Sequence, residues 1–387
     1  MQDKYIEPQI TEYIFHKATV EHRPISGTFE LSPICNYNCR MCYVHQSEEK
    51  LRKQGKKVKP PKFWLDLAKQ AKKEGMLYLL LTGGEPFLYD GFWELYLELV
   101  KMGFVISINS NGSLINERVV EKLKENPPMR INITLYGASD ATYEKMCGVK
   151  NGYTKTIRGI KLLKEAGIQV KLNCSLTPSN MMDLEEMLQF ADENQLILEV
   201  ATYMFPPVRL DEHKKGINHR FSAEEMAIYD MKIALYQRGE EYMEKYVRSM
   251  KNEKVKPGNI NQCQEKEGSQ ILCRAGRGIF WVTWEGEITP CGMMPIPSIP
   301  LQENSFAEAW KKLTEETAKI RLATECKNCS NKEICHVCAG MTYGENLDFT
   351  KKPEYLCDYV NALRKKCEDY EKIFKEGKKC KKELEVC

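Results

Sequence analysis

The chain contains little histidine and little net charge, and it has no long apolar run. Only six of its 387 residues are histidine, and no two have the HExxH spacing of a zinc hydrolase. A formal net charge of +3 does not favour nucleic acid or an anionic membrane as a partner. The longest apolar run, Met76 to Leu81, is far shorter than the roughly 18 residues of a membrane-spanning helix. Since the first ten residues also lack the apolar core of a signal peptide, we expect a cytoplasmic protein.

Cysteine, in contrast, is abundant, with sixteen residues in the chain. Disulfides are rare in a reducing cytosol, so this many thiols predicts metal binding. Because histidine is scarce, the metal chemistry is expected to be mostly thiolate, which favours zinc or iron–sulfur clusters.

Strand-like and helix-like segments alternate over the first half of the chain. Strands are expected at 27–32, 78–82, 104–109, 131–135, 169–175 and 196–202, with helices between them at 61–74, 92–101, 116–125, 154–166 and 182–193. The strands read as nearly continuous apolar runs, which favours a parallel sheet covered on both faces. The pattern predicts an α/β fold, either a doubly wound sheet or a full or partial barrel, and does not choose between them.

Three closely spaced cysteines follow the first expected strand. Cys35, Cys39 and Cys42 form a C-x3-C-x2-C motif. Three thiolates at this spacing can bind three irons of a [4Fe–4S] cubane and leave the fourth iron without a protein ligand. An open coordination position distinguishes a catalytic metal site from a structural one. On spacing alone, a zinc site with a distant fourth ligand is the alternative.

Two neighbouring motifs decide between these alternatives. Tyr43 follows the third cysteine, and the sequence TGGEP follows the second strand at 82–86. Together with the cysteines, these residues closely resemble the radical S-adenosylmethionine (SAM) superfamily, in which a C-x3-C-x-aromatic-C motif precedes a GGEP-type motif. Here Met41 precedes Cys42 and the aromatic residue follows it, an order common in the peptide-modifying branch. The resemblance implies a partial (β/α)6 TIM-like barrel with the cluster at its C-terminal mouth, where barrels place their chemistry.

The resemblance also implies which residues contact SAM. The glycines would let the backbone approach the methionine amino group without interfering side chains. Some of the candidate residues are polar and lie at strand ends, and for these the alternative to contact with SAM is an ordinary structural role. In the implied mechanism, SAM chelates the open iron, one electron breaks its C5′–S bond, and the 5′-deoxyadenosyl radical abstracts a hydrogen atom from the substrate. The candidates are Tyr43, Gly83, Gly84, Glu85, Ser110, Asn111, Thr134 and Asn173.

The C-terminal cysteines resemble a SPASM domain, an extension that carries two auxiliary [4Fe–4S] clusters. Two residues separate the last two clustered cysteines, where that family usually has three, and a pair of zinc knuckles is the alternative. With the catalytic cluster and SAM, the implied cofactors are therefore SAM and three [4Fe–4S] clusters. By resemblance, the first auxiliary cluster is bound by Cys273, Cys291 and Cys338 with Cys263 as a candidate fourth ligand, and the second by Cys326, Cys329, Cys335 and Cys357.

These features predict a division of the chain into parts. We expect an N-terminal extension over 1–26, a radical SAM partial barrel over 27–235 and a helical bridge and linker over 236–262. A SPASM domain with a β-hairpin is expected over 263–360, and a charged helix and tail over 361–387. Of the remaining cysteines, Cys147 and Cys174 are expected to be ordinary barrel residues. Cys367, Cys380 and Cys387 are expected to be free thiols on a mobile tail, with a metal or redox role as the alternative.

The resemblance also narrows the substrate. Members of the family mostly modify peptides, through thioether or carbon–carbon crosslinks, epimerisation or oxidation. Gly292 follows Cys291, where the sulfatase-maturing branch carries an Asp base, which argues against sulfatase maturation. Only 26 residues precede the first strand, too few for a winged-helix leader-binding module, so a separate leader-binding protein is a candidate partner. The basic segment 50–62 is expected to be a solvated loop, or else to attract an acidic leader.

We therefore expect a radical SAM oxidoreductase that modifies a ribosomally made peptide or small protein, supplied with electrons by a flavodoxin or ferredoxin. The alternatives are a dehydrogenase of a small molecule, formylglycine formation like that of a sulfatase maturase, and a metal-binding scaffold without turnover. SAM cleavage with dithionite would distinguish an enzyme from a scaffold. A small cysteine-rich open reading frame beside the gene would favour a peptide substrate.

Overall fold

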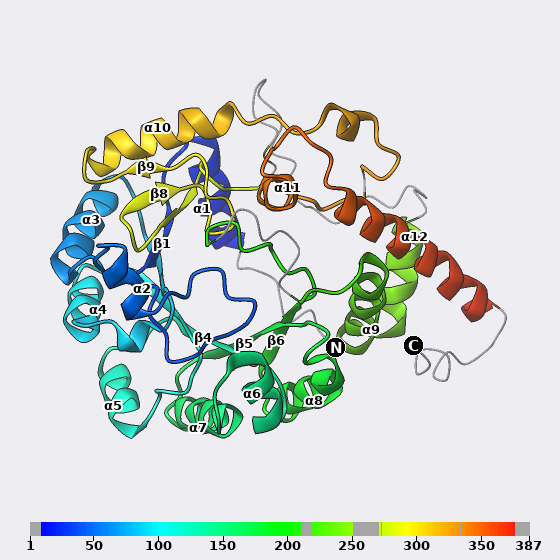
Figure 1. The fold of residues 1–387 in the computed structure, drawn as a ribbon, viewed down its shortest axis with the longest axis horizontal. Coiled ribbons are helices and arrows are strands. Elements are labelled where there is room, and N and C mark those ends of the chain that lie inside the picture. The colour runs from blue at the N-terminus through cyan, green and yellow to red at the C-terminus, as the bar shows by residue number, and fades with distance from the viewer. Residues whose placement is uncertain (1–8, 211–218, 251–270, 272, 333, 376–387) are drawn as a thin grey trace.

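The computed structural model describes residues 9–210, 219–250, 271, 273–332 and 334–375. Within these ranges, nine strands form one sheet in the order β6-β5-β4-β3-β2-β1-β7-β8-β9. Helices α3 to α8 surround the curved sheet and give a partial barrel, which confirms the predicted fold class (Figure 1). The strands are β1 (Ser26–Glu30), β2 (Tyr78–Thr82), β3 (Val105–Ser110), β4 (Arg130–Thr134), β5 (Val170–Ser175), β6 (Ile197–Ala201), β7 (Ile279–Val282), β8 (Glu287–Thr289) and β9 (Ile299–Pro300).

The five helices expected in the first half are present, with bounds that agree to within two residues, and three further helices there were not expected. Those of the barrel are α1 (Gln9–Val20), α2 (Glu48–Lys53), α3 (Pro61–Lys73), α4 (Phe92–Lys101), α5 (Glu117–Glu125), α6 (Asp140–Cys147), α7 (Gly152–Glu165) and α8 (Leu184–Glu193), with short 3₁₀ turns η1 (Pro86–Leu88) and η2 (Met181–Asp183). The later helices are α9 (Ala223–Met250), α10 (Phe306–Ala318), α11 (Ala339–Asn346) and α12 (Glu354–Lys375), with the 3₁₀ turn η3 (Thr324–Asn328).

Local sequence explains where several helices begin and end. The Asn116 side chain accepts a hydrogen bond from the Val119 N–H at 3.0 Å, so it caps α5. Pro61 opens α3, where its missing N–H would have had no partner in the helix. Gly167 follows the end of α7 with a φ of 72°, a left-handed conformation that glycine adopts without steric cost.

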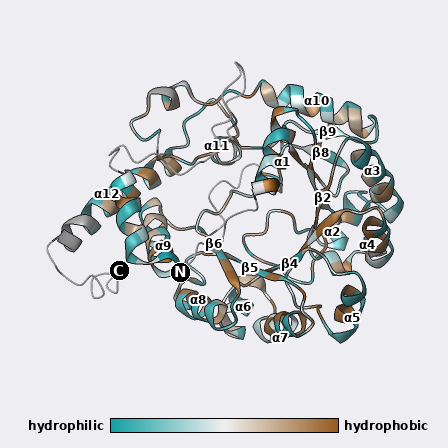
Figure 2. Ribbon diagram, turned by 180° about the vertical axis from the view of Figure 1, so that it is seen from behind, coloured by the Kyte–Doolittle hydropathy of each residue, from teal (hydrophilic) through white to brown (hydrophobic). Residues whose placement is uncertain are grey.

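The parallel strands β1 to β6 have two different faces. On β3, Ile106 and Ile108 are buried and belong to the main hydrophobic core with the surrounding helices. Their neighbours point to the opposite face, where Asn132 donates to Asn109 at 2.7 Å. The expectation of nearly continuous apolar strands is therefore wrong, because one face packs on helices and the other presents polar side chains inside the barrel. Figure 2 shows the matching pattern on α3, α5 and α7, which carry both hydrophilic and hydrophobic segments.

The cysteine-rich part of the chain extends the same sheet. The expected hairpin is confirmed as β7 and β8, which pair antiparallel, and β7 pairs parallel with β1. Farther along the chain, α9 and α12 pack together through a second hydrophobic cluster (Figure 1). Helix α9 is interrupted at Gly239, where φ is 78°, and the predicted division between residues 235 and 236 falls inside this helix.

Some elements and placements differ from expectation. The segment expected as an extension contains α1, and the basic segment 50–62 contains the end of α2 and the start of α3. Cys367 is a free thiol as expected, but it is 1% exposed on α12 in the cluster with α9, so its expected position on a mobile tail is wrong. Cys380, Cys387 and the expected linker 251–261 lie outside the described residues. None of the described helices combines the length and apolar character needed to cross a membrane.

Candidate functional site

The loop after β1 carries the first three cysteines and is attached to the end of α6. The Asn38 N–H donates to the carbonyl of Cys147 at 2.9 Å, and the Arg40 N–H donates to that of Met146 at 3.1 Å. Tyr37 is buried against Tyr143 on the same helix. These contacts fix the backbone on both sides of Cys39, so the spacing of the three sulfurs is set by the fold as well as by the motif.

Backbone and side-chain donors point at these sulfurs. Cys35 Sγ accepts from the Tyr37 N–H at 3.4 Å and from the Asn111 side-chain amide at 3.7 Å. Cys42 Sγ accepts from the His45 N–H at 3.2 Å. Burial, followed by the charge of Glu85 and then by the nearby thiols, raises the pKa of Cys35 to about 12, and burial raises the pKa of Cys42 to about 11. A bound metal would be needed to hold these groups as thiolates at neutral pH. The all-sulfur donor set fits an iron–sulfur cluster.

Cys147 was expected to be an ordinary barrel residue, but the structure places it beside Cys39. A hydrogen bond between the two thiols lowers the pKa of Cys39, and the hydroxyl of Tyr136 donates to the same sulfur. The same contact raises the pKa of Cys147. No local motif marks Cys147, because its position depends on how α6 returns to the cysteine loop.

The two glycines after β2 lie against the backbone that leads to Cys35. The Gly84 N–H donates to the Ser32 carbonyl at 2.6 Å, and the Glu85 N–H donates to the Ile34 carbonyl at 3.0 Å. A Cβ on Gly84 would lie 2.2 Å from the Ile34 oxygen, and Gly83 has a φ of 149°. These positions therefore require glycine for the close approach of two loops, in addition to the predicted approach to SAM.

Glu85 connects the ends of β2 and β3. Its carboxylate is fully buried and accepts from the Ser110 hydroxyl at 2.9 Å and from the Asn111 N–H at 2.9 Å. Burial raises the pKa of Glu85 to about 7, although the hydrogen bonds from Asn111, Ser110 and Phe87 act in the opposite direction. In the structure, Glu85 holds the loop that presents Asn111 to Cys35. Its predicted contact with SAM stays a prediction.

The structure brings most, but not all, of the predicted SAM contacts together. Asn111 also donates to the Asn36 side chain at 2.9 Å, and Asn36 in turn donates to Ser113 at 2.9 Å, so these two residues join the site without a sequence signal. Thr134 and Asn173 lie opposite each other on β4 and β5, which are two and three strands away from β2. They are partly exposed at the sheet, apart from the loop around Cys35.

Three of the C-terminal cysteines form one group. The thiol groups of Cys273 and Cys338 both act on Cys291, whose pKa is raised to about 12, mainly by burial. Gly292 follows Cys291 and lies against the ring of Trp281, where an added Cβ would be 2.9 Å from ring atoms. The Asp found here in sulfatase maturases would therefore meet Trp281, which gives a physical reason for the glycine.

Four further cysteines form a second group. The thiol groups of Cys335 and Cys329 act on Cys326, and burial raises the pKa of Cys357 to about 11, with Cys335 and Cys326 nearby. The assignment of these seven cysteines to two clusters stays a prediction, and Cys263 lies outside the described residues. In the described part of the chain, no three His, Cys, Asp or Glu side chains come together tightly enough to hold one metal ion.

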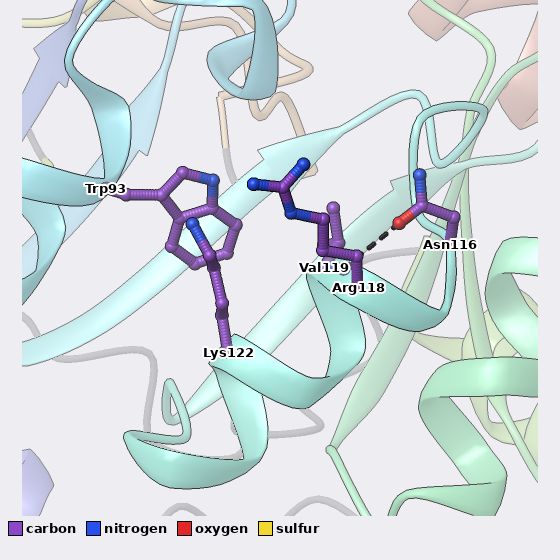
Figure 3. Close-up of a pocket in the computed structure, with 5 residues that line it drawn as sticks. All are labelled: Trp93, Asn116, Arg118, Val119 and Lys122. Atoms are coloured by element: carbon purple, nitrogen blue, oxygen red, sulfur yellow. Dashed lines mark hydrogen bonds between the residues drawn. The ribbon is translucent and has the colours of Figure 1, made fainter.

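A surface pocket of about 280 Å³ lies between α4 and α5 (Figure 3). The Lys122 ammonium lies 4.7 Å from the centre of the Trp93 ring, and Arg118 and Val119 line the same pocket. Asn116 caps α5 from its edge. None of these residues is a cysteine or a predicted SAM contact, so the pocket does not contribute to the site described above.

Comparisons with known proteins agree with this geometry. Residues 29–191 match the family model described as the radical SAM superfamily. The AdoMet-dependent heme synthase of Methanosarcina barkeri is 24% identical over 343 residues, covering 86% of this chain and 95% of that protein. The sporulation killing factor maturation protein SkfB of Bacillus subtilis is 24% identical over 311 residues, 79% of this chain and 68% of that protein.

A solved structure also matches most of the chain. The structure of Streptococcus suis SuiB bound to its precursor peptide SuiA covers 92% of this chain and 82% of its own, at 19% identity and a TM-score of 0.64. The likeness shows that the two proteins share a fold, including the part after the barrel.

Proposed function

We propose that this chain, which belongs to the radical SAM superfamily, installs a post-translational modification on a ribosomally made peptide. The modification would be a crosslink such as a thioether, an epimerisation or an oxidation. The chain is a radical SAM enzyme that binds SAM and a [4Fe–4S] cluster. The peptide substrate is the step beyond that membership.

Cys35, Cys39 and Cys42 would hold the catalytic cluster. When bound, the cluster and SAM would supply a 5′-deoxyadenosyl radical for hydrogen abstraction. The protein's own part is to hold the sulfurs. Asn111 donates to Cys35, and Cys147 shares a hydrogen bond with Cys39, so both favour the thiolate form. The other SAM contacts would be Tyr43, Gly83, Gly84, Glu85, Ser110, Thr134 and Asn173.

The two C-terminal groups would hold auxiliary [4Fe–4S] clusters. Their members are all cysteine, which suits iron–sulfur binding, and a small cysteine-rich region gains much of its stability from bound metal. We assign Cys273, Cys291 and Cys338 to one cluster, with Cys263 as a candidate fourth ligand, and Cys326, Cys329, Cys335 and Cys357 to the other.

The observation that carries the peptide proposal is the position of Tyr43. Burial is the largest cause that raises the pKa of Tyr43, Glu30 and Arg209 follow, and Cys42 and Cys291 also act on it, so the proposed catalytic group and the first C-terminal group both lie near this side chain. The pairing of β7 with β1 produces this arrangement. Among the relatives that match most of the chain, SkfB is named for maturation of a killing factor, and SuiB was solved with a precursor peptide.

A tetrapyrrole is the second candidate substrate. The observation in its favour is the match to AdoMet-dependent heme synthase, which covers 95% of that protein. A tetrapyrrole substrate would correspond to the small-molecule alternative that the sequence left open. The polar inner face of the barrel, with Asn109, Asn132 and a Lys171–Glu199 ion pair, fits the polar backbone of a peptide better than a large apolar ring system.

One experiment compares the two substrates directly. The protein is reconstituted without oxygen and incubated with SAM, dithionite and either a cysteine-rich peptide encoded beside its gene or a set of iron porphyrins. We expect 5′-deoxyadenosine in step with a peptide mass change, such as the loss of two hydrogens on crosslinking. Conversion of a porphyrin to heme without a change in the peptide would replace the proposal with the second candidate.

The remaining assignments are also proposals. We infer a cytoplasmic enzyme that receives electrons from a flavodoxin or ferredoxin, with a separate leader-binding protein as a further candidate partner. We also propose that the chain divides into a radical SAM barrel over 27–235, a bridge over 236–262 and a SPASM domain over 263–360. The SPASM domain shares a sheet with the barrel through β7, so we expect these two parts to unfold together.

A further inference from the structure

Four segments meet at or beside the carboxylate of Glu30, the last residue of β1. Arg209, from the segment after β6, donates to both carboxylate oxygens, at 2.8 and 2.7 Å. The indole N–H of Trp281 on β7 donates to it at 2.9 Å, and the Trp284 N–H in the hairpin turn points at it from 3.5 Å. The Glu30 side chain is fully buried, and the Arg209 side chain is 11% exposed.

The fourth segment is the cysteine loop. The Arg209 guanidinium lies 5.7 Å from the centre of the Tyr43 ring, and Tyr43 follows Cys42 directly. Tyr43 therefore links the ion pair to the cysteine loop, and the two opposite charges of the pair compensate each other.

Such a pair is costly to bury unless both charges are present. Removing one partner leaves an uncompensated charge in a low-dielectric environment, where its field is weakly screened. Reduction of a [4Fe–4S] cluster adds one negative charge, so a nearby cation favours the reduced state and a nearby anion opposes it. Net charge and burial are among the features by which proteins set the potential of such clusters.

We propose that Glu30 and Arg209 form a compensated charge pair that positions Tyr43 and sets the reduction potential of the catalytic cluster. The inference rests on the assignment of that cluster to Cys35, Cys39 and Cys42. Glu30 keeps the potential low enough for electron transfer to SAM, while Arg209 prevents it from falling out of reach of the reductant. Both are positioning residues, because they act on the cluster through the cysteine loop.

The test is a redox titration of the intact, reconstituted protein with dithionite, followed by electron paramagnetic resonance. The catalytic signal is identified as the one that changes when SAM is added. We expect Glu30→Gln to raise its potential and Arg209→Gln to lower it, while the double variant Glu30→Gln/Arg209→Gln returns close to wild type. A role that is only structural would not give shifts of opposite sign.

A second buried ion pair provides the control. Arg220 and Glu345 are 13% and 8% exposed and lie 2.5 Å apart, but Arg220 stacks on Tyr355 instead of Tyr43. Arg220→Gln and Glu345→Gln should lower thermal stability to a similar extent as the test variants and leave the catalytic potential unchanged.

A neutral substitution at Trp281 provides a second test of the charge pair. If the single variants do not fold, Trp281→Phe removes the indole N–H from Glu30 without changing the charge, and it should lower the potential slightly. Shifts of the same sign, no shift, or equal shifts in the control pair would overturn the inference. If the wild type shows no signal that responds to SAM, the cluster assignment fails instead.

Discussion

The cysteines at the barrel mouth and the second C-terminal group differ in how the protein holds them. At the mouth, the loop is hydrogen-bonded to α6 and to the turn after β2, and Cys35 and Cys42 accept backbone N–H bonds. In the second C-terminal group, Cys329 is exposed, and its sulfur accepts from the Asn331 backbone N–H at 3.4 Å. If clusters bind at both sites as we propose, the first site would be organised by the fold beforehand, whereas the second would depend more on the metal itself.

This difference has a functional meaning. A catalytic cluster must present its open iron in a fixed orientation, so its ligands need rigid support. An auxiliary cluster that is fully bound by protein can instead order the chain around it. The variants below test whether the two sites respond to change as this contrast predicts, from the largest expected effect to the smallest.

Removing the catalytic ligands should have the largest effect. In the triple variant Cys35→Ala, Cys39→Ala, Cys42→Ala, we expect 5′-deoxyadenosine formation to fall to background and iron content to drop by one cluster of about four irons. The barrel should stay folded, because backbone contacts hold the loop. Iron and sulfide analysis, circular dichroism and an assay for 5′-deoxyadenosine measure these outcomes. Retained SAM cleavage would contradict the assignment of this site.

Removing a ligand of the second C-terminal group should loosen that region and leave SAM cleavage in place. For Cys357→Ala, we expect product formation to fall at least ~10-fold, since even outer partners of metal ligands have effects of this size. Hydrogen exchange should increase in α11 and α12 but not in α4 or α5. Cys174→Ala, at a buried cysteine of β5 outside both groups, is the control. If hydrogen exchange in α11 and α12 increases no more than in α4 and α5 in Cys357→Ala, the two cysteine sites do not differ as predicted.

The sequence predicts the periodic and the motif-bearing parts of this molecule. The strands and helices of the barrel alternate with clear period and were placed correctly, whereas the ligand roles of the cysteine motifs stay a prediction. Cys147, Asn36 and Arg209 escaped prediction because each acts through a contact between segments far apart in the chain. A lone cysteine, asparagine or arginine has no periodic or spacing signal, and only the folded arrangement gives it a role.

The same reason explains why some predicted positions have a further role that the motif did not indicate. Glu85 was expected to contact SAM as part of a glycine-rich turn, and its carboxylate is also buried and accepts a hydrogen bond from Ser110. Gly84 was expected to make room for SAM, and it also makes room for the Ile34 carbonyl. A motif identifies which residues matter, whereas the direction of each side chain depends on how the neighbouring loop packs.

Glu85→Gln should change how stability depends on pH. In the fold, the pKa of Glu85 is raised from 4.5 to about 7, so the stability it contributes is complete below its unfolded value and is lost as pH rises through about 7. Glutamine does not titrate, so the free energy of unfolding of the variant relative to wild type should increase by ~3 kcal/mol across this range. Urea unfolding of reduced, metal-free protein between about pH 5 and pH 8 measures it. Parallel profiles for the two proteins would contradict the prediction.

The smallest expected effects come from two alanine substitutions that compare the crowding of the two regions. At Gly84, the new Cβ would lie 2.2 Å from a backbone oxygen, so the loop before Cys35 must move, and we expect a loss of about 1–3 kcal/mol in stability together with weaker cluster binding. At Gly340, beside Cys338, the nearest atom would be 3.5 Å away. Because Gly340 lies in α11, alanine there should stabilise the protein by about 0.5–1 kcal/mol and leave iron content unchanged. Thermal unfolding and iron analysis of both variants measure this contrast, and a loss of iron in Gly340→Ala would show that the C-terminal site is as tightly packed as the barrel mouth.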